Sequence, residues 1–133
     1  MNAVFLDTVG LLALWDTAGQ WHAAAEAAFR QVQGRRSAVV TTTFILLECG
    51  NAAARRTYRL DVCDLRRLLE QRKEVVAPTT QDWTEAWQAY ERGDCGQAGI
   101  VDHLSFSVMR RLGLTQAFTN DRHFQAAGFQ TLF

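Results

Sequence analysis

The chain has 133 residues, enough for one ordinary domain with a core and too few for two domains of typical size. Hydrophobic residues make up 48% of it and charged residues 21%, which excludes the disordered and collagen-like classes of protein. Its 14 basic residues balance 14 acidic ones, so the net charge of zero provides no global electrostatic argument for nucleic-acid binding.

Export and membrane insertion are not expected either. No apolar run approaches the roughly 20 residues that a membrane-spanning helix requires. The first 15 residues have no basic segment and are interrupted by Asp7, so we expect no signal peptide and a cytoplasmic protein. The cysteines Cys49, Cys63 and Cys95 are odd in number and lack the spacing of zinc sites, which predicts reduced thiols.

The first half of the chain predicts two strand-helix units. In chain order the elements are a strand over residues 3–6, helices over 11–16 and 21–33, a strand over 37–43 and a helix over 44–56. The strands are apolar or β-branched, whereas the helices have apolar residues at helical spacing. Gly34 ends the second helix, and the threonines of the second strand are placed to cap the helix that follows.

The second half continues the alternation. In chain order we predict a helix over 61–73, a strand over 74–78, helices over 79–93 and 100–113, a strand ending at 118–120, a short helix over 121–128 and a terminal strand over 129–133. Thr79 or Thr80 is placed to cap the helix over 79–93. Large aromatic side chains are usually well buried, so all four tryptophans are expected in the core. These are Trp15, Trp21, Trp83 and Trp87.

Strands that alternate with helices predict an α/β fold, in which a mostly parallel sheet is covered by helices on both faces. We assign it to one domain spanning residues 1–133. Ligands of such sheets bind at the carboxyl ends of the strands. Asp7 and Asp121 each follow a predicted strand, so both are expected at this edge, with Phe118 and Phe124 anchoring the second turn in the core.

Four acids are candidates for a site, although each has a structural interpretation. Asp7 and Asp121 are placed to cap the helices that follow them. Asp102 lies in the first turn of a helix, where the helix dipole favours a carboxylate by about 0.3–1 kcal/mol, yet its neighbours are apolar. Glu48 lies in a helix with no Lys or Arg one turn away, and an apolar setting is costly for a charge that nothing neutralises.

A shared divalent cation explains the four acids together. At an effective dielectric near 20, two carboxylates about 4 Å apart repel each other by about 4 kcal/mol. Hard oxygen ligands suit Mg²⁺ or Mn²⁺, which commonly bind phosphate substrates and activate water for hydrolysis. The residues therefore predict metal-dependent hydrolysis of a nucleic-acid backbone. Thr119 and Asn120 are expected to support the site beside Asp121, and Thr8 beside Asp7.

The same acids stand in motifs that resemble the PIN-domain family over essentially the whole chain. The motifs are VFLDT at 4–8, LLECGNA at 46–52, IVDHLSFSVMRRLG at 100–113 and FTNDRHFQAAGF at 118–129. Within the family they most resemble the single-domain VapC-type toxins of bacterial type II toxin–antitoxin systems. One local departure is the pair Val9-Gly10, where relatives often carry Ser or Asn; it concerns the polar support beside Asp7 and not Asp7 itself.

The resemblance implies an α/β/α sandwich and a Mg²⁺- or Mn²⁺-dependent endoribonuclease that inhibits translation or growth. Carried over residue by residue, its catalytic and metal-binding acids are Asp7, Glu48, Asp102 and Asp121. It also implies a homodimer and a small antitoxin bound over the active-site groove. His123 is expected to pack or hydrogen-bond in its short helix rather than act as a general base.

Two alternatives stay open at this point. The chain can be a binding module that holds RNA or a protein partner without cutting. The segment 51–73 carries seven basic residues against three acidic ones, which fits a solvated helix face as well as it fits a surface for RNA, an antitoxin or a second copy.

Overall fold

The structure, a computed structural model, describes residues 3–133. Within these residues a five-stranded sheet has the order β3-β2-β1-β4-β5, and every neighbouring pair is parallel. The strands are β1 (Val4–Leu6), β2 (Val39–Thr42), β3 (Val75–Val76), β4 (Gln116–Phe118) and β5 (Gln130–Thr131). The predicted parallel sheet is confirmed.

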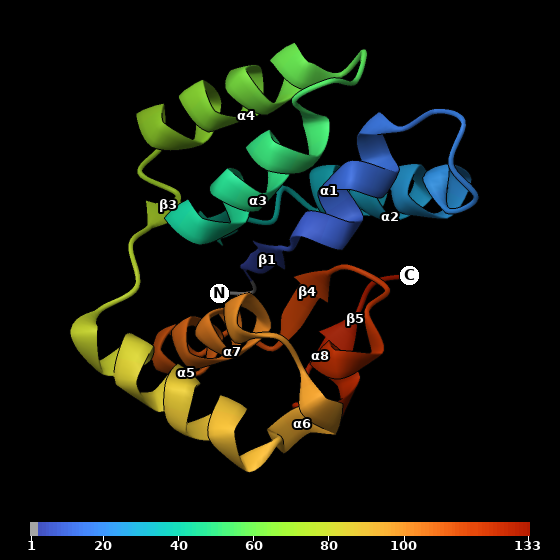
Figure 1. The fold of residues 1–133 in the computed structure, drawn as a ribbon. Helices are drawn as coiled ribbons and strands as arrows, with labels where there is room; N and C mark the ends of the chain where they lie inside the picture. The colour runs from blue at the N-terminus through green and yellow to red at the C-terminus, as the bar shows by residue number, and fades with distance from the viewer. Residues whose placement is uncertain (1–2) are drawn as a thin grey trace.

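Helices cover both faces of this sheet, so the predicted α/β/α sandwich is also confirmed. They are α1 (Thr8–Trp15), α2 (His22–Gly34), α3 (Thr43–Ala53), α4 (Arg59–Gln71), α5 (Thr80–Arg92), α6 (Asp94–Gln97), α7 (Ile100–Leu112) and α8 (Arg122–Ala126). In Figure 1, α1 to α4 lie on one side of β1, whereas α5 and α7 lie on the other. The described residues include no helix that is long and apolar enough to span a membrane.

The central strand is the most deeply buried element. Val4, Phe5 and Leu6 of β1 are almost fully inaccessible, because neighbouring strands flank them and helices cover them. Phe118 and Phe124 are fully buried in the same core, which confirms that they anchor the turn between them. The loops that follow β1 and β4 are therefore held by a rigid base.

The polar residues at helix starts act as caps. Asp7 accepts a hydrogen bond from the backbone of Val9 at the start of α1, and Thr42 caps α3. Thr79 and Asp82 form a reciprocal capping box on α5, each side chain accepting from the other's backbone N–H. The caps expected from the sequence are thus present.

Gly10 allows α1 to lie against the end of β4. A Cβ atom at this position would be 2.0 Å from the carbonyl oxygen of Phe118, far inside any permitted contact. The missing side chain brings the start of α1 close to the turn after β4. Asp7 and Thr119 lie on the two sides of this contact.

The prediction that all the tryptophans lie in the core is wrong. Trp21, Trp83 and Trp87 have exposed fractions of 51%, 46% and 37%, whereas Trp15 is partly buried and stacks on Tyr58. The inward face of α5 is occupied by smaller or polar residues such as Ala86, which leaves its tryptophans on the outer face. There they contact each other edge to face, which shields part of their apolar surface.

The loop expected before α7 is confirmed. The four-residue segment α6 within it is an irregular turn rather than a regular helix. Cys95 and Gly96 have φ values of 56° and 69°, in the left-handed region. The three cysteines are free, as expected.

Candidate active site

Asp7 lies at the carboxyl end of the central strand and is only 1% exposed. Its Oδ2 accepts a hydrogen bond from Oγ1 of Thr119 at 2.8 Å and another from the backbone of Val9 at 3.3 Å. Leu6 pairs with Phe118 in the sheet, so the next residue of each strand reaches the same level. The register of β1 and β4 therefore places Thr119 beside Asp7, 112 residues away in sequence.

Thr119 also connects Asp7 with the next acid. Its Oγ1 accepts a hydrogen bond from the backbone N–H of Asp121 at 3.1 Å. The Thr119 hydroxyl thus donates to the side chain of Asp7 and accepts from the backbone of Asp121. Asn120, between Thr119 and Asp121, is partly buried.

Glu48 reaches the site from α3, and its position depends on Thr8. Oγ1 of Thr8 donates a hydrogen bond to Oε1 of Glu48 at 2.6 Å. Thr8 therefore supports Glu48 through its hydroxyl, whereas Val9 supports Asp7 through its backbone. The Val9 contact does not depend on the residue type, because a backbone N–H is available whatever the side chain.

Asp102 and Asp121 meet at His123. Asp121 caps α8 by accepting from the backbone of His123 at 2.9 Å, and Asp102 lies in the first turn of α7. Nδ1 of His123 is 2.8 Å from Oδ1 of Asp121 and 3.8 Å from Oδ2 of Asp102. The three side chains can offer one ligand atom each within 4.8 Å of one another. His123 was expected only to pack or hydrogen-bond in its short helix, but its ring lies beside both acids.

The pKa values indicate that the acids share one electrostatic environment. Burial raises the pKa of Asp7 to about 7; the Thr119 hydrogen bond lowers it, and the charges of Asp102 and Asp121 raise it further. Burial likewise raises the pKa of Asp102 to about 6, with Asp121 and Glu48 raising it and His123 lowering it. The four predicted acids thus lie together at one edge of the sheet.

Cys49 provides a further link between Asp7 and Glu48. Burial raises the pKa of this thiol to about 12, and the charges of both acids raise it as well. The thiol therefore stays protonated and is a poor nucleophile or metal ligand.

The donor set fits a divalent cation. Among residues 3–133, none of the four acids forms an ion pair with Arg or Lys, and the ion-pair contacts of Asp102 and Asp121 are with His123. Clustered carboxylates with raised pKa values are stabilised when a cation neutralises them. Oxygen donors of this kind suit Mg²⁺ or Mn²⁺.

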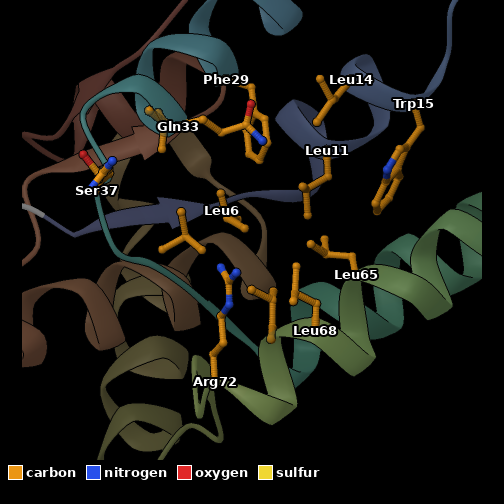
Figure 2. A pocket seen from close by; sticks show the side chains of 14 residues that line it. Leu6, Leu11, Leu14, Trp15, Phe29, Gln33, Ser37, Leu65, Leu68 and Arg72 are labelled. Carbon is orange, nitrogen blue, oxygen red and sulfur yellow. The ribbon is translucent and has the colours of Figure 1, made fainter.

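A separate apolar pocket lies between α1, α2 and α4. It has a volume of about 570 Å³, and Figure 2 shows Leu65 of α4 facing Leu11 and Trp15 of α1 across it. None of the four acids lines it, but Leu6, the residue before the first of them, does. Arg72 at the end of α4 adds a positive charge to its edge.

Part of the basic segment 51–73 is a solvated helix face. Arg66 and Arg67 form ion pairs within α4, with Glu70 and Asp64 respectively. Arg72 instead contributes to the apolar pocket. Arg66 and Arg67 therefore fit the interpretation as a solvated helix face.

Comparison with known proteins identifies the fold. The PIN-domain family matches residues 4–130. Two proteins of Mycobacterium tuberculosis, from strains CDC 1551 / Oshkosh and ATCC 25618 / H37Rv, are both named 23S rRNA-specific endonuclease VapC20. Each is 30% identical over 127 residues, which cover 95% of this chain and 95% of the relative.

The crystal structure of Mycobacterium tuberculosis VapC20, described as a Sarcin-Ricin loop cleaving toxin, is similar in three dimensions. It has a TM-score of 0.76 and 26% sequence identity, with 95% of each chain covered. The family match over nearly the whole chain and the similar architecture agree with the motifs around the four acids. The chain belongs to the PIN-domain family and resembles its VapC-type toxin ribonucleases.

Proposed function

We propose that the chain is a metal-dependent endoribonuclease, the toxin of a type II toxin–antitoxin pair, which inhibits translation in the cytoplasm by cutting RNA. The observation that carries the proposal is the convergence of Asp7, Glu48, Asp102 and Asp121 at one edge of the sheet, without Arg or Lys partners among residues 3–133. The similarity to VapC20 over 95% of both chains supports RNA as the substrate.

In this proposal the four acids are the catalytic and metal-binding residues, and the ion is Mg²⁺ or Mn²⁺. When bound, the ion supplies a Lewis acid that orients a phosphodiester and lowers the pKa of a water molecule. Asp7 and Glu48 are fixed for this task by the hydroxyl groups of Thr119 and Thr8. Such preorganisation avoids rearrangement of the charged groups during the reaction.

The side of the site at Asp102 and Asp121 is where we expect substrate to enter. Their side chains are 21% and 19% exposed, whereas Asp7 is almost fully buried. Asn120 adjoins this side and is proposed to donate to a phosphate oxygen. Unpaired loop bases are the parts of RNA that proteins most often recognise by sequence, so we propose a ribosomal RNA loop as the substrate.

The decisive test is cleavage of a ribosomal RNA loop by purified protein with Mg²⁺ or Mn²⁺, with EDTA, and with the Asp7→Asn variant. Loss of a metal-binding carboxylate is expected to reduce the rate by about 100-fold or more, because each metal effect contributes several kcal/mol. Asp61→Asn, an exposed acid on α4, is the matched control. Cleavage that survives EDTA and Asp7→Asn would refute the metal-nuclease proposal.

The same experiment separates cleavage from simple binding. A binding module is expected to retain RNA without cutting it under any metal condition. Binding without cleavage in the presence of Mn²⁺ and Mg²⁺ would therefore favour that alternative.

The proposed protein partner is a small antitoxin, and the apolar pocket of Figure 2 is a candidate surface for it. Leu65, Leu68 and Arg72 of α4 offer an apolar face with a positive edge, which suits an apolar segment that carries acidic residues. Leu68→Glu is expected to weaken binding of the protein encoded by an adjoining short reading frame. Leu60→Glu is the control, because Leu60 is exposed on α4 and does not line the pocket.

A homodimer is the proposed assembly, and the outer face of α5 is the surface that favours it. Trp83, Trp87 and Tyr90 are exposed there at 46%, 37% and 48%, and contact one another in a row. Exposed apolar patches of this kind commonly mark protein interfaces. Light scattering of the wild type and of Trp87→Glu tests this, since the variant is expected to be monomeric and a monomeric wild type would contradict the proposal.

A further inference from the structure

His123 differs from the other residues at the sheet edge because it offers nitrogen rather than oxygen. Its Nδ1 lies 2.8 Å from Asp121 and 3.8 Å from Asp102, closer to these acids than any Arg or Lys among the described residues. Its side chain is 40% exposed, so the ring has room to turn. Among the described contacts, Nδ1 has no partner other than these two acids.

The surroundings hold this ring beside the two acids. Asp121 caps α8 at the backbone of His123, which fixes the start of the helix that carries the imidazole. On another side lies Gly96 in the left-handed segment of α6, where a Cβ atom would be 3.6 Å from Cδ2 of the ring. The irregular turn before α7 therefore packs against one side of the His123 ring.

The site consequently has two halves with different donor chemistry. Asp7 and Glu48 form an all-oxygen half, supported by the hydroxyl groups of Thr119 and Thr8. Asp102, Asp121 and His123 form a mixed half with two carboxylates and one imidazole, whose ligand atoms lie within 4.8 Å of one another. Imidazole is a good ligand for first-row transition-metal ions, whereas Mg²⁺ prefers oxygen and keeps its water.

We propose that His123 is a metal ligand of the mixed half and makes it select a transition-metal ion, for which Mn²⁺ is the probe, over Mg²⁺. This inference rests on the proposed function, because it requires that the acids bind a divalent cation. Nδ1 donates to Asp121 when it carries a proton; once that proton leaves and the ring keeps a proton on Nε2 alone, Nδ1 presents its lone pair to the ion. Ligand atoms bound about 2.1 Å from one ion lie about 3 Å apart when adjacent, so small rotations of the side chains are sufficient.

The test measures ion binding rather than activity. Mn²⁺ bound to the wild type is expected to show ¹⁴N modulation from an imidazole in pulsed electron paramagnetic resonance, and His123→Asn is expected to lose it. The Mn²⁺ dissociation constant of this variant should rise about 10- to 100-fold, which is the usual effect of losing support at a metal site. Its Mg²⁺ dissociation constant should change by less than about 3-fold. Arg122→Ala, an exposed neighbour on α8, controls for disturbance of the helix.

The outcomes separate this inference from the proposed function. A wild type that binds Mn²⁺ without ¹⁴N modulation would overturn the histidine ligand and leave the metal-nuclease proposal intact. Equal weakening of Mn²⁺ and Mg²⁺ in His123→Asn would also overturn it, because it would indicate general positioning of Asp121. A wild type that binds neither ion would overturn both.

Discussion

Replacing Asp7 with Asn is expected to stabilise the metal-free protein, with a gain in the free energy of unfolding that grows with pH. The pKa of this carboxyl is raised from 3.8 to about 7 in the folded state, first by burial. Between these values the folded chain keeps a proton that the unfolded chain has lost, so the free energy of unfolding falls as the pH rises. An amide does not titrate and avoids this loss.

The size of the effect follows from the pKa difference at about 1.36 kcal/mol per unit. The variant is expected to exceed the wild type by about 1.5 kcal/mol at pH 5 and by about 4 kcal/mol at pH 8. Below about pH 3 both states of the wild type are protonated, and the difference vanishes. The amide also fits the site, since its oxygen can accept the hydrogen bonds that Asp7 now accepts from Thr119 and Val9.

Urea unfolding in EDTA between pH 5 and pH 8 measures this difference, with Asp61→Asn as an exposed control that should follow the wild type. Excess Mg²⁺ should reverse the order, because a ligand that binds the folded state stabilises it and Asp7→Asn has lost a ligand. Parallel pH profiles for the wild type and Asp7→Asn would refute the view that a strained, buried carboxylate waits for a cation.

Three further outcomes are expected. Gly10→Ala should lower the free energy of unfolding by about 3 kcal/mol, since its Cβ meets a backbone oxygen. Gly50→Ala, whose Cβ has nothing within 4 Å, should raise the free energy of unfolding by about 0.5–1 kcal/mol. Similar urea midpoints for the two variants would contradict this. Thr119→Val should weaken Mn²⁺ binding about 10-fold or more in calorimetry while Thr119→Ser preserves it, and a weak serine variant would argue against the hydroxyl. Asp82→Ala should lower the free energy of unfolding by about 1–2 kcal/mol in urea, because it removes the ion pair with the partly exposed Arg111 and half of the capping box on α5; a loss within error would contradict the importance of these contacts.

The elements and their caps were predictable because local patterns determine them. Asp7, Thr42 and Thr79 cap helices as their residue types suggest, and short apolar runs become the parallel strands. The convergence of the acids follows from topology, since the carboxyl ends of parallel strands share one edge. This level of the site needs no knowledge of side-chain packing.

The partners of each acid were not predictable, because they depend on register and tertiary contacts. Thr119 was expected beside Asp121, and its hydroxyl does accept from the backbone of Asp121. The pairing of β1 with β4 also places this hydroxyl against Asp7, which the sequence did not indicate. Thr8 was expected beside Asp7 and contacts Glu48 instead, which requires the position of α3 relative to α1. His123 comes near Asp102 through the packing of α8 and α7, far apart in the local pattern.

Asp7 and Asp82 show how the surroundings of an inaccessible carboxylate determine its pKa. Both side chains are almost inaccessible to solvent, at 1% and 2% exposure, but Asp7 lies deeper in the core, so burial acts more strongly on its pKa. Burial raises the pKa of Asp82 as well, but hydrogen bonds from Arg111 and Thr79 outweigh it and hold the pKa below 3.8. Asp7 has hydrogen bonds but no Arg or Lys partner among residues 3–133, and its pKa rises to about 7. The fold neutralises Asp82 with arginine but leaves Asp7 without a cation. Asp7 is therefore retained at a cost in stability, as expected where a bound ion provides the charge.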